Sequence, residues 1–213
     1  MDDIKFTSLA DKVFLRIESD ILSGVYAPGT LLTELGLSKE LDVSRTPIRE
    51  AIRRLEQENL VKETPKGHVV LGITQRDICD IYDIRLKIEG VATAMCAKNI
   101  SDENLLKLKE TLELQEFYTD KGEADKIKSA DSEFHQIIFE NCGSEIYSSI
   151  LATLHKKVQL GRKASVSDSD RAKRAIKEHR EIYNALLSRD EKLAEALAIQ
   201  HVNNAKISIM RLK

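Results

Sequence analysis

The chain has 213 residues, a length that suits one large domain or two small ones. Hydrophobic residues make up 42% of it and charged residues 32%, which predicts a buried core and excludes a disordered tail protein. No apolar run of about 18 residues occurs, and the acidic start lacks the apolar segment of a signal peptide, so we expect no membrane span. The three cysteines, Cys79, Cys96 and Cys142, form no CxxC pair, which predicts free thiols in a reducing cytoplasm. The net charge of -2 excludes a uniformly basic nucleic-acid coat but allows a local basic patch.

The first third of the chain predicts three helices. Apolar residues recur every fourth position within residues 8–23, which indicates one amphipathic helix that ends at Gly24. Thr33 is a suitable cap for a short second helix, and Ser44 for a third helix with Pro47 in its first turn.

Two short strands follow these helices. Residues 60–63 and 68–73 have strand character, and the Thr-Pro-Lys-Gly sequence at 64–67 forms a turn between them. Three helices and a β-hairpin in residues 1–73 predict a winged helix-turn-helix domain.

The remainder, residues 74–213, is predicted to be an all-helical antiparallel bundle, so the fold class is mainly α. Only 3 prolines and 9 glycines interrupt the chain, which favours helix over a strand-rich fold. The six expected helices lie at about 74–98, 101–119, 123–141, 144–163, 169–188 and 191–211.

The third helix is strongly basic. Residues 44–54 contain four arginines and one glutamate, a local net charge of +3. Arg45 and Arg49 lie four positions apart and share a face, while the isoleucines of the same helix lie on another face. One buried face and one cationic face suit a recognition helix in a DNA major groove, where arginine can bind guanine. The alternative is a solvated charged face, which is common on surface helices.

The first part of the chain resembles the winged helix of the GntR family of bacterial transcription factors. The resemblance rests on residues 21–24, 26–29 and 43–56, of which the run from Val43 to Leu55 is the most specific. It implies that the third helix contacts operator bases and phosphates and that the glycine of the wing tip approaches the groove. The expected DNA-binding residues are Ser44, Arg45, Thr46, Arg49, Arg53, Lys66, Gly67 and His68.

The family usually has glycine where this chain has Asp42 and Asn59. Both positions follow helices, and Asp and Asn adopt a positive φ there at modest cost, so we expect the geometry to be kept. Gly36, inside the short second helix, has no explanation in the sequence.

Four polar residues of the helical region form a candidate metal site. His179 and His201 are equally far from residue 190, the turn between the last two helices, and each should stand about 16 Å from it. They would therefore lie level with each other, and Asp131 and His135 share one face of a third helix. Three imidazoles and a carboxylate suit Zn²⁺, Ni²⁺, Mn²⁺ or Fe²⁺. The alternative is that each histidine is a hydrogen-bonded or surface residue.

Residues 74–212 also resemble a known domain, the FCD effector domain of the FadR-type branch. The resemblance rests on Ile84 to Glu89, Asp131 to His135, Glu178 to Ile182 and Ala194 to His201. It implies that Asp131, His135, His179 and His201 bind a divalent metal, whereas His68 and His155 match no ligand position. It further implies that Arg85, and as a weaker candidate Arg162, binds the carboxylate of an effector.

These features predict a ligand-responsive transcriptional regulator, most often a repressor in this family. A homodimer would bind a pseudo-palindromic double-stranded operator. A small carboxylate metabolite would bind at the metal, most suitably zinc or nickel, with manganese or iron as alternatives. A metal-dependent enzyme with the same four ligands is the other hypothesis, but the sequence offers no clear general base beside them, so we expect no enzyme. A purely structural metal is a third alternative.

Overall fold

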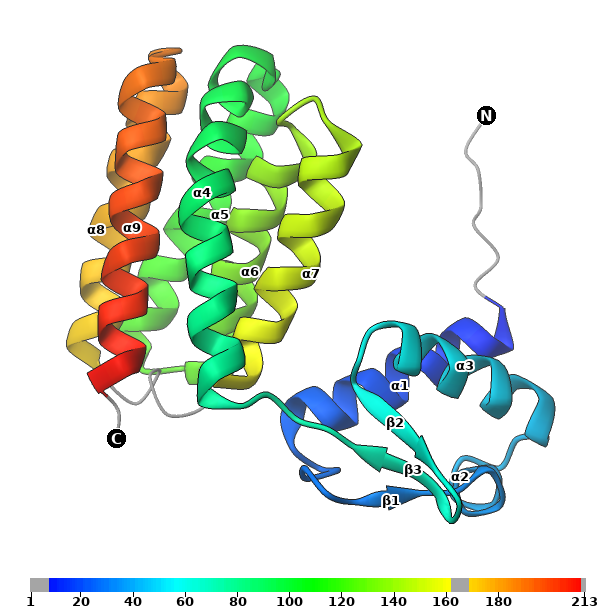
Figure 1. Ribbon diagram of the computed structural model, residues 1–213. Coiled ribbons are helices and arrows are strands. Elements are labelled where there is room, and N and C mark those ends of the chain that lie inside the picture. Colours follow the sequence, from blue (N-terminus) through cyan, green and yellow to red (C-terminus); the bar gives the residue numbers. More distant parts are fainter. Residues whose placement is uncertain (1–7, 162–168, 212–213) are drawn as a thin grey trace, which may run out of the picture. The chain divides into compact units, whose positions relative to one another are not determined.

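The computed structural model describes residues 8–161 and 169–211. Contacts divide the chain into two compact units, Met1–Thr74 and Gln75–Lys213. Both are mainly helical, and only the first contains a β-sheet among the described residues (Figure 1). No helix in the described ranges is long and apolar enough to cross a membrane.

The first unit is a winged helix-turn-helix, as predicted. Its elements are α1 (Leu9–Ser23), β1 (Leu31–Leu32), α2 (Glu34–Glu40), α3 (Arg45–Gln57), β2 (Val61–Thr64) and β3 (Gly67–Val70). The strands form an antiparallel sheet in the order β1-β3-β2, with Leu31 opposite Val69 and Lys62 opposite the same residue. The sequence predicted the hairpin but not β1, because two residues show no strand periodicity.

Local side-chain chemistry sets the ends of these helices. Ser8 and Asp11 form a reciprocal capping box at the start of α1, and Gly24 ends that helix with φ 77°. The Thr33 hydroxyl accepts a hydrogen bond from the Gly36 N–H at the start of α2. A Cβ at position 36 would lie 2.9 Å from this hydroxyl oxygen, which explains the glycine.

The turns that follow α2 and α3 keep the expected geometry. Asp42 has φ 51° and Asn59 has φ 55°, both in the left-handed region, so the expectation for these two positions is confirmed. The helices that these turns connect pack around one core, in which Ile17, Ile48 and Leu55 are fully buried. The basic helix α3 is thus fixed by its apolar face, and its arginine-bearing face stays at the surface.

The second unit consists of six helices in its described part. They are α4 (Gln75–Asn99), α5 (Asp102–Lys121), α6 (Ala124–Glu140), α7 (Glu145–Gly161), α8 (Ser169–Leu187) and α9 (Glu191–Arg211). Successive helices run in alternate directions, and the bounds lie within two residues of the predicted ones (Figure 1). The mainly helical fold class is confirmed.

The turn between α8 and α9 is held to the end of α4. Arg189 adopts φ 58°, and its guanidinium donates hydrogen bonds to the carbonyl oxygens of Ala97 and Ile100 and to Asp102. These carbonyls lie at the C-terminal end of α4, where intrahelical donors are missing. The arginine therefore ties the turn between α8 and α9 to the end of α4 and the start of α5.

Candidate metal centre and DNA interface

Three buried histidines meet inside the helical unit. His135 comes from α6, His179 from α8 and His201 from α9, and their possible ligand atoms lie within 4.8 Å of one another. The rings of His179 and His201 are 4.7 Å apart between centroids, which matches the level position expected from their spacing about residue 190. The exposed fractions of the three residues are 2% or less.

Two of these histidines are oriented by glutamates. The Nδ1 atom of His201 lies 2.7 Å from Glu178 Oε2, and that of His135 lies 3.4 Å from Glu89 Oε1. Their Nε2 atoms are buried and have no hydrogen-bond partner among the described residues. A buried ring nitrogen with no partner, on a ring whose other nitrogen is anchored, is the arrangement that a metal ligand requires.

Gln115 and Asp131 complete the surroundings of the third histidine. The Nδ1 atom of His179 lies 2.8 Å from Gln115 Oε1, so the ring is anchored like the other two. Asp131 Oδ1 lies 3.9 Å from His179 Nε2 and 3.5 Å from Gln115 Nε2. The carboxylate is buried and lies beside His179, outside the group of three imidazoles whose possible ligand atoms lie within 4.8 Å of one another. This donor set fits a divalent transition metal.

The protonation states also fit metal binding. Burial lowers the pKa of His201, and the hydrogen bond that its ring donates to Glu178 only partly opposes this, which favours the neutral imidazole. Burial alone would raise the pKa of Glu89, but Arg85 and His135 hold it well below its usual range. The pKa of Glu178 is lowered too, because His201 and Arg171 outweigh its burial. Both glutamates are therefore ionised acceptors for the ring N–H groups.

Of the two arginines expected to bind an effector, the structure describes only Arg85. Arg85 is fully buried, and its guanidinium binds both carboxylate oxygens of Glu89 at 2.7 and 3.0 Å. It thereby supports the glutamate that orients His135. Arg162 lies outside the described residues.

Sequence reasoning missed several residues of this centre. Gln115 gave no signal, because its role depends on a contact between α5 and α8. Glu178 was named only in the run that carries the domain resemblance, but its side chain reaches His201 on α9. His155 of α7 was set aside, yet it is buried, its ring lies 4.8 Å from that of His135, and its Nε2 lies 4.0 Å from Asp131 Oδ2.

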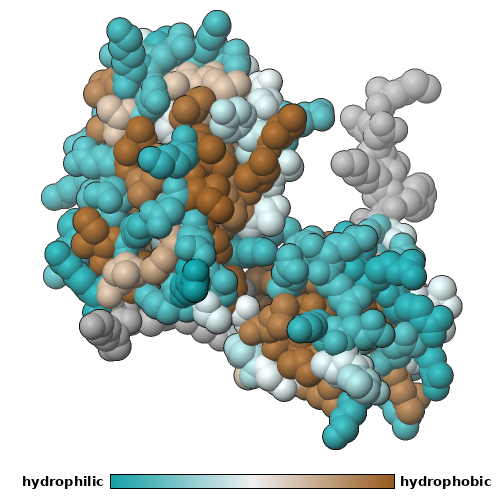
Figure 2. Space-filling view, viewed as in Figure 1, coloured by the Kyte–Doolittle hydropathy of each residue, from teal (hydrophilic) through white to brown (hydrophobic). Residues whose placement is uncertain are grey.

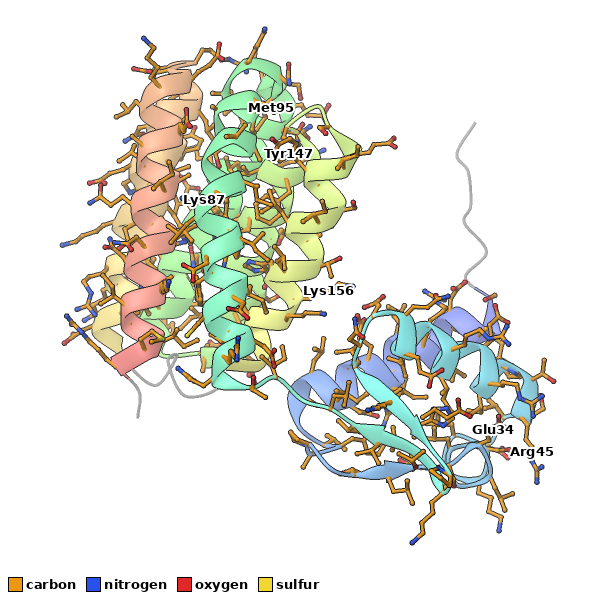
Figure 3. All side chains as sticks on the ribbon, in the orientation of Figure 1. Glu34, Arg45, Lys87, Met95, Tyr147 and Lys156 are labelled. Carbon is orange, nitrogen blue, oxygen red and sulfur yellow. The ribbon has the colours of Figure 1, made fainter. Side chains whose placement is uncertain are left out.

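The surface of α3 carries most of the predicted DNA-binding residues. Ser44, Arg45, Thr46, Arg49 and Arg53 are all exposed. Ser44 makes no side-chain hydrogen bond as the N-cap of α3. The Arg49 guanidinium binds both carboxylate oxygens of Glu34, each at 2.9 Å, and Figure 3 shows Glu34 near Arg45 at the same end of the unit.

The wing residues Lys66 and His68 differ in their surroundings. Lys66 is exposed at the turn, but the His68 ring lies 3.5 Å from Glu56 of α3 with 15% of its side chain exposed. His68 belongs to the central strand β3, whose pleat directs its side chain toward α3 rather than outward at the tip. Gly67 has φ 136°, and a Cβ there would lie 2.6 Å from the Leu32 carbonyl oxygen, so the wing needs glycine for its own folding.

Comparisons with known proteins agree with both units. Residues 9–69 match the bacterial regulatory proteins of the gntR family, and residues 80–204 match the FCD domain. The chain belongs to the GntR family. This GntR-family regulator is 27% identical to the HTH-type transcriptional regulator YdhC of Bacillus subtilis over 96% of its own length and 93% of that protein.

Two further relatives of the GntR-family regulator are informative. The gluconate operon transcriptional repressor of Bacillus licheniformis is 28% identical over 85% of this chain and 77% of that protein. The structure of McbR from Escherichia coli has a TM-score of 0.83, with 22% identity, over 96% of this chain and 98% of that one, which supports the same fold. The relatives are transcriptional regulators and not enzymes, so the enzyme hypothesis is set aside.

Proposed function

We propose that this regulator is a metal-dependent repressor that releases its operator when a small carboxylate binds the helical domain. The observation that carries the proposal is the group of three buried imidazoles whose Nδ1 atoms are anchored and whose possible ligand atoms lie within 4.8 Å of one another. The name of the Bacillus licheniformis relative supports repression of an operon for an acid. Residues 1–73 would then be the DNA-binding domain and residues 74–213 the effector and dimerisation domain, and the protein would act in the cytoplasm.

The DNA contacts are assigned to the exposed face of α3 and the wing turn. Arg45 and Arg49 suit bases, and Ser44, Thr46, Arg53 and Lys66 suit phosphates; Gly67 allows close approach of the wing backbone. His68, whose ring lies 3.5 Å from Glu56, stays a candidate contact beside Lys66.

The DNA assignment is tested by replacing both arginines. Arg45→Ala/Arg49→Ala should weaken binding to a duplex selected from a random library by the unmodified protein, by at least about tenfold, and should reduce the slope of log affinity against log salt. Arg16→Ala is a matched control, because the Arg16 side chain is 63% exposed and that of Arg49 is 64% exposed. Unchanged binding by the double variant would contradict the assignment.

The metal is assigned to His135, His179, His201 and Asp131. A bound divalent ion, zinc or nickel in the first place and manganese or iron otherwise, would supply positive charge for a carboxylate of the effector. His179→Ala/His201→Ala should lose the metal in elemental analysis, whereas His68→Ala, in the other compact unit, should retain it. Full metal content in the double variant would refute this ligand set.

The effector response requires unequal binding to two states of the regulator. A carboxylate that binds one state more tightly shifts the population toward it, and equal binding shifts nothing. Arg85 stands beside this centre through Glu89, and Arg162 remains a weaker candidate contact. If the metal were purely structural, a chelator would lower the melting temperature but no organic acid would change DNA binding.

A homodimer is assigned to the face made by α4 and α7. These helices pack together, and Ile84, Ile146 and Ile150 on them are exposed, with the last two four residues apart. Figure 2 shows a hydrophobic area over this face, and Lys87 and Lys156 lie along it in Figure 3. An exposed apolar area of this kind suits an interface with a second copy.

Sedimentation equilibrium tests the dimer face. Ile84→Glu/Ile150→Glu should give monomers, because each glutamate places a charge in an apolar interface. Leu106→Glu/Leu114→Glu is the matched control, since these leucines of α5 are similarly exposed. A dimer in the first variant, or a monomer in the control alone, would contradict the assignment.

A further inference from the structure

An acidic residue lies within the basic surface assigned to DNA. Glu34 is the first residue of α2, and both of its carboxylate oxygens accept hydrogen bonds from the Arg49 guanidinium of α3, each at 2.9 Å. Hydrogen bonding to Arg49 lowers the pKa of Glu34, and the nearby charge of Arg45 acts in the same direction, so the carboxylate is ionised. Sequence reasoning did not single out Glu34, because it lies 15 residues before Arg49 and on another helix.

The fold of the first unit fixes the position of Glu34. The Thr33 hydroxyl caps α2 immediately before Glu34, and Leu37 of the same helix is buried in the core. The Ser38 hydroxyl donates a hydrogen bond to the Val43 carbonyl oxygen at 2.6 Å, which ties α2 to the turn before α3. The carboxylate is therefore held at a defined place beside α3.

The ion pair uses one edge of the Arg49 guanidinium and leaves another edge for DNA. Nε and Nη2 donate to Glu34, whereas a guanidinium carries five N–H donors in one plane. The end edge, made of Nη1 and the second N–H of Nη2, takes no part in this pair. Its two parallel N–H groups form the fork that binds O6 and N7 of guanine, and the Arg49 side chain is 64% exposed, so a base can reach it.

The same pair changes the energetics of DNA binding in two ways. Ordering a long arginine side chain on a base costs conformational entropy, and Glu34 restricts that side chain before DNA binds. The negative charge of Glu34 repels phosphates on every sequence, and only a sequence that engages the held fork offsets this repulsion. Both effects raise the difference in affinity between sequences rather than the affinity for DNA in general.

We propose that Glu34 is a positioning residue that sets the base preference of this regulator by holding Arg49 end-on for a guanine. Glu34 touches no base and acts through Arg49. This inference rests on the proposed function, because it requires α3 to read operator bases.

Selection from a random duplex library, followed by sequencing, measures the base preference of the full chain at each position of its site. The unmodified protein should prefer guanine at a position where Arg49→Ala has no preference. Glu34→Ala should reduce the guanine preference at that position by about tenfold, because the fork is no longer held. In the Arg49→Ala background, Glu34→Ala should change the base preference no further, since the two residues act as one unit.

Glu50→Ala is the matched control for charge. Glu50 is an exposed glutamate of α3, and its replacement changes the charge of the first unit by the same amount as Glu34→Ala. The control should keep the guanine preference, and an equal loss in both variants would assign the effect to charge alone and overturn the inference. Thermal unfolding should be similar for both variants and the unmodified protein, because an ion pair with an exposed arginine contributes little to stability.

The outcomes separate this inference from the proposed function. A guanine preference that is lost in Arg49→Ala but kept in Glu34→Ala overturns the inference alone. Tighter binding of the selected duplex by Glu34→Ala, with the base preference unchanged, also overturns it, because the pair would then withhold Arg49 from DNA. A base preference that survives in Arg45→Ala/Arg49→Ala overturns the DNA assignment, and the inference with it.

Discussion

At the scale of single residues, the metal centre depends on how each imidazole is held. The spacing of His179 and His201 about residue 190 predicted that they meet, and the structure places their rings 4.7 Å apart. The anchors could not be predicted, because Gln115 and Glu89 reach the histidines from helices that are distant in sequence. Periodicity identifies helix faces, but it does not say which side chains of two packed faces touch.

One residue-scale prediction concerns Glu178. Its carboxylate receives hydrogen bonds from His201, Asn204 and Arg171, so it fixes the ring of His201. Glu178→Ala should weaken metal affinity by about 10–100-fold without removing a ligand. A competition titration against a metal chelator measures this, and Glu181→Ala, an exposed neighbour, is the control. Equal affinities for the two variants would show that Glu178 does not orient the site.

A second prediction concerns His155, which the sequence set aside. Its Nε2 lies 4.0 Å from Asp131 Oδ2, whereas the Nε2 of His179 lies 3.9 Å from the other carboxylate oxygen, Oδ1. His155→Phe should keep one metal per chain but weaken its binding, because the position of Asp131 is less well defined. Loss of the metal altogether would instead make His155 a direct ligand.

At the scale of elements, the sequence predicted long regular segments better than short contacts. The helices α4 to α9 begin and end within two residues of expectation, since capping residues such as Ser101 mark them. The two-residue strand β1 was missed, and with it the reason for Gly67, which passes close to the Leu32 carbonyl of that strand. The same strand pairing puts His68 next to the turn of the hairpin, with its ring 3.5 Å from Glu56 of α3.

The close approach of Gly67 to the Leu32 carbonyl oxygen can be tested by substitution. Gly67→Ala would bring a Cβ to about 2.6 Å from the Leu32 oxygen at φ 136° and should destabilise the first unit by about 1–3 kcal/mol. Gly122→Ala is the control, because φ there is 70° and no atom lies within 4 Å of the added Cβ. Thermal unfolding followed by circular dichroism should show the larger loss for Gly67→Ala. The opposite order would contradict this account of the wing.

At the scale of the whole molecule, two units with different chemistry are joined in one chain. The first presents arginines on a helix fixed by its apolar face, and the second buries imidazoles from three helices at one centre. The family assignment explains why both are present in a regulator. Regulation then requires that metal and acid, bound in the second unit, alter the affinity of the first for DNA.

The central claim is that His135, His179 and His201 bind one divalent metal together with Asp131. X-ray absorption spectroscopy of the full chain loaded with one equivalent of zinc tests it most directly. The account predicts about three imidazole nitrogens and one or two oxygens near 2.0–2.2 Å. A shell that contains sulfur, or only oxygen, would contradict it.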